Sequence, residues 1–256
     1  HAARGTACHQ ISEKCLRTGV DAIEFLGTVE KTKEHAIEID EELVNSAQMY
    51  VDYCRKRLKA YKDETGEDAI FWIEERFSLA SLETPFDAGG TGDFVIYFPK
   101  WALLEIVDLK NGMGVVEVDG NPQGRSYGLG AVLEHGDISI DEVKVTIVQP
   151  RASWGLTANV EWGRTPDGSF ISADGRLCVS ADKKTRSETF HVADLVAWTA
   201  DLLKAMARSK QAMDEYEAAK TNGVVLDEWV EKWLTPGKCT FSPVEGTDPE
   251  LRKQAL

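Results

Sequence analysis

The stretch LLEIVDLK, residues 103–110, decides how this chain is expected to fold. Its Leu, Ile and Val residues are typical of a buried central strand, where a charged side chain is costly unless it has a role. Because side chains alternate along a strand, Asp108 and Lys110 project from the same face, about 7 Å apart. An Asp-x-Lys pair also fits an ordinary ion pair on a surface strand. The apolar residues before it favour a functional site.

Further strands and helices are predicted on both sides of this stretch. Strands rich in Ile, Val, Phe and Trp are expected at residues 69–80, 92–98, 102–110 and 144–149. Helices are expected from apolar periodicity at residues 3–18, 34–64, 188–219 and 225–234. A further helix is expected over residues 121–132, with Asn121 as its N-cap and Pro122 in its first turn.

The order helix, three strands, helix, strand predicts an α/β fold with a central mixed sheet flanked by helices. A core is expected over about residues 4–151. Turn signals predict an irregular insertion with small hairpins at about 152–186, and a helical C-terminal extension covers 187–256. Since 256 residues with 43% hydrophobic side chains can bury one large core, we expect a single domain over residues 1–256.

Composition excludes some classes of protein. No run of 18 apolar residues suggests a membrane span and no secretory signal is visible, so the sequence predicts a soluble, cytoplasmic protein. The net charge of −14 argues against a protein that coats nucleic acid, but it permits an enzyme with one local basic groove. Five widely spaced cysteines argue against a disulfide framework. The first residue is His1, and we expect natural sequence upstream of it.

A second carboxylate is expected beside Asp108. Asp93 opens the preceding strand, and a hairpin between the two strands would place their carboxylates side by side. Two neighbouring carboxylates are costly without a cation, and hard oxygen ligands select Mg²⁺ or Mn²⁺. Such a cation would support phosphodiester hydrolysis, with Lys110 orienting the nucleophile or stabilising charge.

Three motifs follow one another within 38 residues: Gly90-Thr91-Gly92-Asp93, Asp108-Leu109-Lys110 and the segment Gln123-Gly124-Arg125-Ser126-Tyr127. This order resembles the RecB-like exonuclease branch of the PD-(D/E)xK superfamily, and the likeness extends from residue 4 to about 151. With Asn121-Pro122-Gln123 and Ile147-Val148-Gln149-Pro150-Arg151, the chain looks more narrowly like a group of phage-encoded RecB-like proteins. The resemblance implies a restriction-endonuclease-like core and a metal-dependent DNA nuclease whose catalytic centre holds Asp93, Asp108 and Lys110.

The resemblance also implies roles for residues outside these strands. Gly5-Thr6-Ala7-Cys8-His9 matches a family context for a metal-binding histidine. The implied metal ligands are His9, Asp93, Asp108 and the main-chain carbonyl of Leu109. Gln123 and Tyr127, four residues apart on one helix face, are implied to position the substrate.

Three further residues are candidates from their places in the sequence. Arg125 and Arg151 are the nearest cations and are candidates for phosphate contacts, although each also suits an ordinary surface charge. Glu74, on the first predicted strand, matches an acidic position of the family and is a candidate supporting residue. A solvated carboxylate is an equally good interpretation of Glu74.

The C-terminal segment departs from the family pattern. RecB-like relatives often hold an iron–sulfur cluster with three cysteines near the C-terminus, but here Ser242 and Asp248 stand at two of these positions and only Cys239 remains. No cluster is therefore expected. An exonuclease is favoured because most relatives with Gln-x-x-x-Tyr degrade DNA from its ends. A single-strand annealing protein is an expected partner by analogy, and the alternatives are an endonuclease and a non-catalytic DNA-binding module.

Overall fold

The computed structural model describes residues 2–33, 35–152, 162–164, 170–172, 177–178, 184–221, 229 and 232–233. They fall into two compact units: the first runs to Ser81 and continues over Gly89–Val196, and the second comprises Leu82–Ala88 and the described residues from Ala197 onward. All the predicted site residues belong to the first unit. The expectation of one domain over residues 1–256 stays a prediction. Among the described residues, no helix combines the length and the apolar character needed to cross a membrane.

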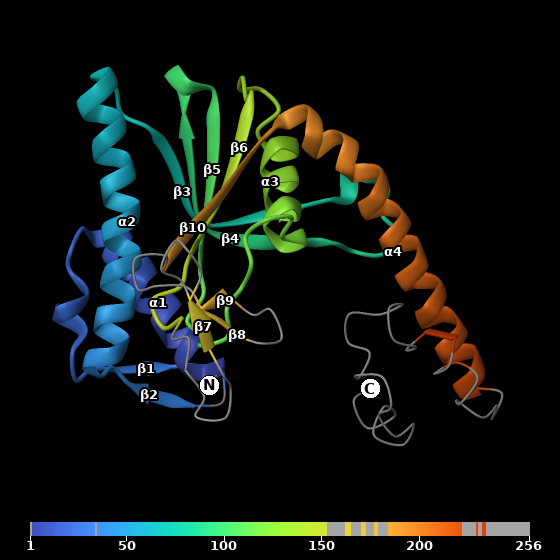
Figure 1. Ribbon diagram of the computed structural model, residues 1–256, viewed down its shortest axis with the longest axis horizontal. Helices are drawn as coiled ribbons and strands as arrows, with labels where there is room; N and C mark the ends of the chain where they lie inside the picture. The colour runs from blue at the N-terminus through green and yellow to red at the C-terminus, as the bar shows by residue number, and fades with distance from the viewer. Residues whose placement is uncertain are drawn as a thin grey trace. The chain divides into compact units, whose positions relative to one another are not determined.

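The first unit is built on a five-stranded mixed sheet, which confirms the predicted α/β class with a central sheet flanked by helices (Figure 1). In spatial order its strands are β10 (Thr185–His191), β6 (Glu142–Val148), β5 (Leu103–Leu109), β4 (Gly89–Phe98) and β3 (Ile70–Ser78). Only β5 and β6 run parallel, and the other neighbours are antiparallel. Every residue of β5 is buried, as its apolar run predicts for a central strand.

Alternation along β4 and β5 divides the core between the two faces of the sheet. Helices α1 (Ala2–Thr18) and α2 (Glu41–Thr65) pack on the face that carries Phe94, Ile96 and Val107. Helix α3 (Pro122–Glu134) covers the other face, which carries Val95 and Ile106. Asp93 and Asp108 follow the alternation of this second face.

The predicted helix over residues 34–64 begins too early. Residues 36–38 form β2 (Ala36–Glu38), which pairs as an antiparallel hairpin with β1 (Val29–Lys31). Helix α2 starts at Glu41 because the side chain of Asp40 accepts a hydrogen bond from the Leu43 N–H, 2.9 Å away. The carboxylate cap fixes the boundary, and the apolar periodicity alone did not reveal it.

The predicted helix from residue 188 also begins too early. Residues up to His191 belong to β10, and α4 (Val192–Thr221) starts directly after it. Pairing with β6 supplies the backbone hydrogen bonds of this edge strand, and Phe190 packs against Val145 and Ile147. Tertiary pairing therefore overrides the helical signal.

The insertion contains short paired strands. Strands β7 (Trp162–Arg164), β8 (Phe170–Ser172) and β9 (Leu177–Cys178) form a small antiparallel sheet, in agreement with the predicted hairpins. Of the helix predicted over residues 225–234, the structure describes Trp229, Lys232 and Trp233, which are helical. Cys239, Ser242 and Asp248 lie outside the described residues, so the expected absence of an iron–sulfur cluster stays a prediction.

Short connections complete the described elements. Three 3₁₀ turns lie between the helices and strands, at η1 (Ala22–Phe25), η2 (Ala80–Leu82) and η3 (Pro99–Trp101). The turn η3 joins β4 to β5, and its following residue, Ala102, adopts a left-handed backbone with φ 46°. This tight connection fixes the register of the hairpin on which the candidate site is built.

Candidate carboxylate site

Two predicted carboxylates lie side by side at the ends of β4 and β5. The last backbone pair between these strands joins Phe94 to Val107. Asp93 and Asp108 are the next residues outward, so the antiparallel register places them opposite each other. The hairpin expected from the sequence therefore brings these two carboxylates together.

Glu74 extends this row of carboxylates onto β3. Its neighbours Ile73 and Glu75 pair with Phe94 and Gly92 of β4, which leaves Glu74 opposite Asp93. The Glu74 backbone has φ 55°, a left-handed conformation that is costly for a residue with a side chain. The ladder is interrupted at this point. We call Glu74, Asp93 and Asp108 the carboxylate row.

Both oxygens of Asp93 are oriented by neighbours. Its Oδ2 accepts a hydrogen bond from the backbone N–H of Leu109 at 2.7 Å. Its Oδ1 lies 3.3 Å from Nδ1 of His9, which α1 brings to the row. The predicted histidine and the predicted carboxylate therefore meet, although α1 and β4 are far apart in sequence.

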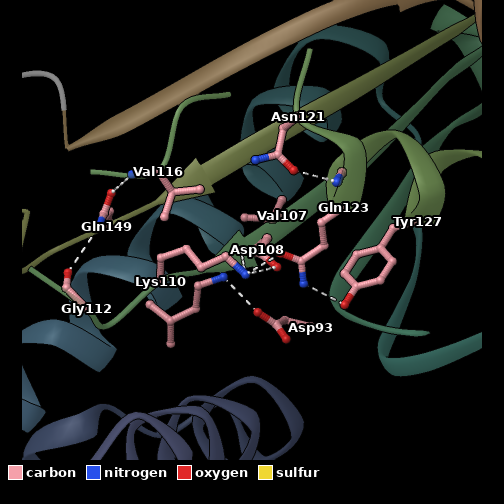
Figure 2. Close-up of polar contacts among 12 residues, drawn as sticks. Asp93, Val107, Asp108, Lys110, Gly112, Val116, Asn121, Gln123, Tyr127 and Gln149 are labelled. Atoms are coloured by element: carbon pink, nitrogen blue, oxygen red, sulfur yellow. Dashed lines mark hydrogen bonds and ion pairs between the residues drawn. The ribbon is translucent and has the colours of Figure 1, made fainter. Parts of the chain in front are cut away.

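Lys110 is held between the row and α3 (Figure 2). Its ammonium nitrogen lies 3.1 Å from Oδ1 and 2.8 Å from Oδ2 of Asp108. The same ammonium donates to Oε1 of Gln123 at 2.9 Å, and Nε2 of Gln123 donates to the hydroxyl oxygen of Tyr127 at 2.8 Å. The two predicted α3 residues thus act on Lys110, and one continuous chain of hydrogen bonds links helix and strand.

Small residues let α3 approach the sheet closely enough to make these contacts. A methyl group on Gly90 would lie 2.2 Å from a ring carbon of Tyr127, and one on Gly124 would lie 2.5 Å from the side chain of Val145. Asn121 caps α3 by accepting from the Gly124 N–H at 2.9 Å. Gly90, in the first predicted motif, therefore makes room for Tyr127 of the third.

The row carries more negative charge than its surroundings neutralise. Burial and the neighbouring charge of Asp93 raise the pKa of Asp108 to about 6, against the opposing effect of Lys110. Burial and Asp93 likewise raise the pKa of Glu74 to about 7. Burial acts to lower the pKa of His9, but its hydrogen bond with Asp93 and the nearby carboxylates outweigh burial and raise it. A cation would relieve all three shifts.

The donor atoms suit a divalent cation. His9, Glu74 and Asp93 each offer one ligand atom, and these three atoms lie within 4.8 Å of one another. One imidazole nitrogen with carboxylate oxygens fits Mn²⁺ well and Mg²⁺ acceptably. Asp108, which the sequence placed in the metal set, is paired with Lys110, while Glu74 joins the three-residue cluster. The sequence showed that residue 74 is acidic, but it did not show the left-handed backbone of Glu74.

The sequence of this chain matches a known protein family. The family model "Protein of unknown function (DUF2800)" matches residues 1–164 of the 256. This chain belongs to the DUF2800 family. The matched part includes the carboxylate row, Lys110 and the whole of α3. No solved structure matches the chain.

In this DUF2800 chain the two predicted phosphate contacts, Arg125 and Arg151, are engaged elsewhere. Arg125 lies 2.7 Å from a carboxylate oxygen of Glu188 on β10, and Arg151 lies 2.8 Å from one of Glu42 on α2. A guanidinium nitrogen of Arg151 also donates to the backbone carbonyl of Asn111 at 3.3 Å. Neither arginine joins the carboxylate row, and their contact with phosphate stays a prediction.

Gln149 was named in the sequence only as part of a motif, with no role of its own, and in the structure it fixes the loop that follows Lys110 (Figure 2). It is fully buried. Its Nε2 donates to the carbonyls of Gly112 and Gly114 at 3.1 and 2.5 Å, and its Oε1 accepts from the Val116 N–H at 3.2 Å. The same oxygen accepts from Arg186 at 2.6 Å. A buried amide at the end of β6 therefore holds residues 112–116 in place.

Proposed function

We propose that this DUF2800 chain is a metal-dependent DNA nuclease with a PD-(D/E)xK core of the RecB-like type. The observation that carries the proposal is the carboxylate row beside Lys110, with His9 against Asp93. The motif order of the RecB-like branch adds independent support, because the residues that carry that resemblance are those that meet in space. DNA is proposed as the substrate on the same resemblance.

Mg²⁺ or Mn²⁺ would be held by His9, Glu74 and Asp93, with Asp108 and the Leu109 carbonyl completing the proposed ligand set. Such an ion supplies Lewis-acid stabilisation of phosphate charge and lowers the pKa of an attacking water. The positions of these donors are fixed by three strands and a helix, so little reorganisation would be needed on binding.

Lys110 is proposed to stabilise negative charge on the phosphate and to orient the nucleophile. Its ammonium is held by Asp108 and Gln123, which costs the side chain its rotamer freedom before the substrate arrives. Gln123 and Tyr127 are proposed as positioning residues, because they act on the reacting groups through Lys110. An Arg at position 110 would not fit the same two acceptors in the same way.

An exonuclease is favoured over an endonuclease on the Gln123-x-x-x-Tyr127 resemblance. A role in phage-type recombination or DNA processing, in a bacterial cytoplasm and alongside a single-strand annealing protein, is proposed by the same analogy.

Digestion of end-labelled linear DNA beside a covalently closed circle tests the proposal. With Mn²⁺ or Mg²⁺, we expect loss of the linear DNA, survival of the circle and no reaction in EDTA. Asp108→Asn keeps the side-chain shape and is expected to reduce the rate at least about 10³-fold. Asp63→Asn is the matched control, since Asp63 is an exposed carboxylate that pairs with Lys59 on the surface of α2.

The outcomes separate the alternatives. Cleavage of the circle would indicate an endonuclease of the same fold. No cleavage of either DNA by folded wild-type protein, with DNA binding retained, would replace the nuclease by a non-catalytic binding module.

A further inference from the structure

Arg17, near the end of α1, makes two contacts that lead to the carboxylate row. Its Nη2 donates a hydrogen bond to the backbone carbonyl of Ile73 on β3 at 3.0 Å. Its Nε donates to a carboxylate oxygen of Glu13, one helical turn earlier, at 2.7 Å. Since His9 lies one turn before Glu13, these three residues share one face of α1. The helix face that brings His9 to Asp93 therefore also brings Arg17 to β3.

The carbonyl that Arg17 holds belongs to the peptide group between Ile73 and Glu74. Because the peptide bond itself is planar, the orientation of this group is set by the ψ angle of Ile73 and the φ angle of Glu74. Glu74 is the residue with the left-handed φ of 55°, at the point where the ladder between β3 and β4 is interrupted. The hydrogen bond from Arg17 therefore acts on a dihedral angle that departs from ordinary strand geometry.

A left-handed backbone at a glutamate is costly and persists only where surrounding contacts fix it. In the described register, β3 pairs with β4 through Ile73 and Glu75 but not through Glu74. The guanidinium of Arg17 supplies a restraint at this gap in the ladder, because its planar fork can hold a carboxylate and a carbonyl at the same time. Relaxation of the backbone would redirect the Glu74 side chain and move its carboxylate away from the other donor atoms of the cluster.

We propose that Arg17 is a positioning residue for the divalent cation, which keeps the carboxylate of Glu74 in the carboxylate row by holding the peptide group before it. Helix α1 then orients two ligands of the cluster, Asp93 through His9 and Glu74 through Arg17. The inference rests on the cation site of the proposed function, and it adds to that site a residue that acts through Glu74.

The charge of Arg17 and its hydrogen bond have opposite effects on cation binding. A positive charge beside the row repels a cation, and it opposes the rise in the pKa of Glu74 that burial and Asp93 cause. Removal of the charge alone would therefore tighten the binding of Mn²⁺. Loss of the hydrogen bond would weaken binding, because the Glu74 carboxylate must then be ordered when the ion arrives. The direction of the change separates the two roles.

Titration of the metal-free full chain with Mn²⁺, followed by the electron paramagnetic resonance signal of the free ion, measures this direction. Arg17→Met keeps the aliphatic stem but removes the charge and the donors, and we expect about tenfold weaker binding than in wild type. Arg17→Lys keeps the charge but lacks the planar fork, so it should also bind Mn²⁺ more weakly. Both variants should stay folded, because the side chain of Arg17 is half exposed.

Two further proteins complete the test. Arg4→Met is the matched control, since Arg4 lies on the same helix but pairs with Asp40 and Glu42, and it should bind Mn²⁺ as wild type does. Glu74→Gln removes the carboxylate that Arg17 is proposed to position. Arg17→Met added to Glu74→Gln should therefore cause no further weakening.

Binding by Arg17→Met that is as tight as that of wild type or tighter, or an equal loss in the Glu74→Gln background, would overturn the positioning role and leave the cation site. Absence of Mn²⁺ binding by folded wild type would overturn the cation site and the positioning role together. The titration needs no DNA. A protein that binds Mn²⁺ with this dependence on Arg17 but cuts no DNA therefore keeps the positioning role and removes the nuclease.

Discussion

Strand β5 carries two buried acidic residues, three positions apart, whose surroundings differ. Glu105, on the face covered by α1 and α2, has no exposed surface and is fully compensated. Its carboxylate accepts from Tyr53, Arg57 and Thr146 at 2.6, 2.6 and 2.7 Å and lies 3.3 Å from the ammonium of Lys144. Asp108, on the other face, shares one lysine with Gln123 and lies beside a second carboxylate, that of Asp93.

The contrast shows that this sheet can neutralise a buried carboxylate where the role is structural. At Glu105 two cations and two hydroxyls surround one negative charge. At the carboxylate row Lys110 and His9 lie among three carboxylates, and burial together with the neighbouring charge of Asp93 raises the pKa values of Glu74 and Asp108. The missing positive charge is what we expect a divalent cation to supply.

The largest difference in stability should separate Glu105→Gln from Asp93→Asn. Glu105→Gln leaves two cations without their counter-charge, and because both are partly exposed we expect the free energy of unfolding to fall by about 2–4 kcal/mol. Asp93→Asn relieves repulsion within the row while its amide oxygen can still accept from Leu109, so we expect a change within about 1 kcal/mol. Urea unfolding of metal-free protein measures both. A Glu105→Gln protein as stable as wild type would contradict the difference drawn between Glu105 and the carboxylate row.

Glu74→Gln should stabilise the metal-free protein and weaken its hold on Mn²⁺. Since Glu74 is half buried and solvent screens its repulsion from Asp93, the gain at pH 8 is expected to be about 1 kcal/mol. Glu75→Gln is the matched control, because Glu75 is the neighbouring glutamate outside the row. Equal effects of the two substitutions on Mn²⁺ affinity would show that Glu74 has no special place in the site.

The smallest expected effect is a pH dependence of metal-free stability. The pKa values of Glu74, about 7, and Asp108, about 6, lie above those of unfolded chains, near about 4. The folded protein therefore binds protons more tightly at these groups. Their favourable contribution is complete below about pH 4 and is lost as pH rises through 6 to 7. The raised pKa of His9 acts in the same direction.

Unfolding of the metal-free protein at pH 6 and pH 8 measures this contribution. Saturating Mn²⁺ should flatten the difference, because the cation replaces the protons, and Glu74→Gln should reduce it. If the stability of wild type and of Glu74→Gln changed equally between pH 6 and pH 8, with and without the cation, the carboxylate row would already be neutralised and this prediction would be wrong.

The sequence predicted those parts of the fold whose signals are local. The apolar run of residues 103–110 identified the central strand, and Asn121-Pro122 located the start of α3 to within one residue. Strand β10 was not predicted because its sequence, TRSETFH, is polar and becomes a strand only through pairing with β6. The start of α2 depended on the Asp40 cap, which periodicity does not register.

The residues of the candidate site also include some that local sequence signals predicted and others whose place depends on the folded chain. Asp93, Asp108 and Lys110 were predictable because strand alternation and a short hairpin relate them. The place of Glu74 depends on the β3–β4 register and a left-handed backbone, which only the folded chain defines. The pairing of Arg125 with Glu188 joins α3 to β10 across 63 residues, so its engagement could not be read from the local sequence.

Titration of metal-free protein with Mn²⁺, followed by the electron paramagnetic resonance signal of the free ion, tests the central claim most directly. We predict saturable binding by wild type, loss of that binding in Asp93→Asn and its retention in Asp63→Asn. Absence of binding by folded wild type, or unchanged binding by Asp93→Asn, would contradict the assignment of the carboxylate row as a divalent-cation site.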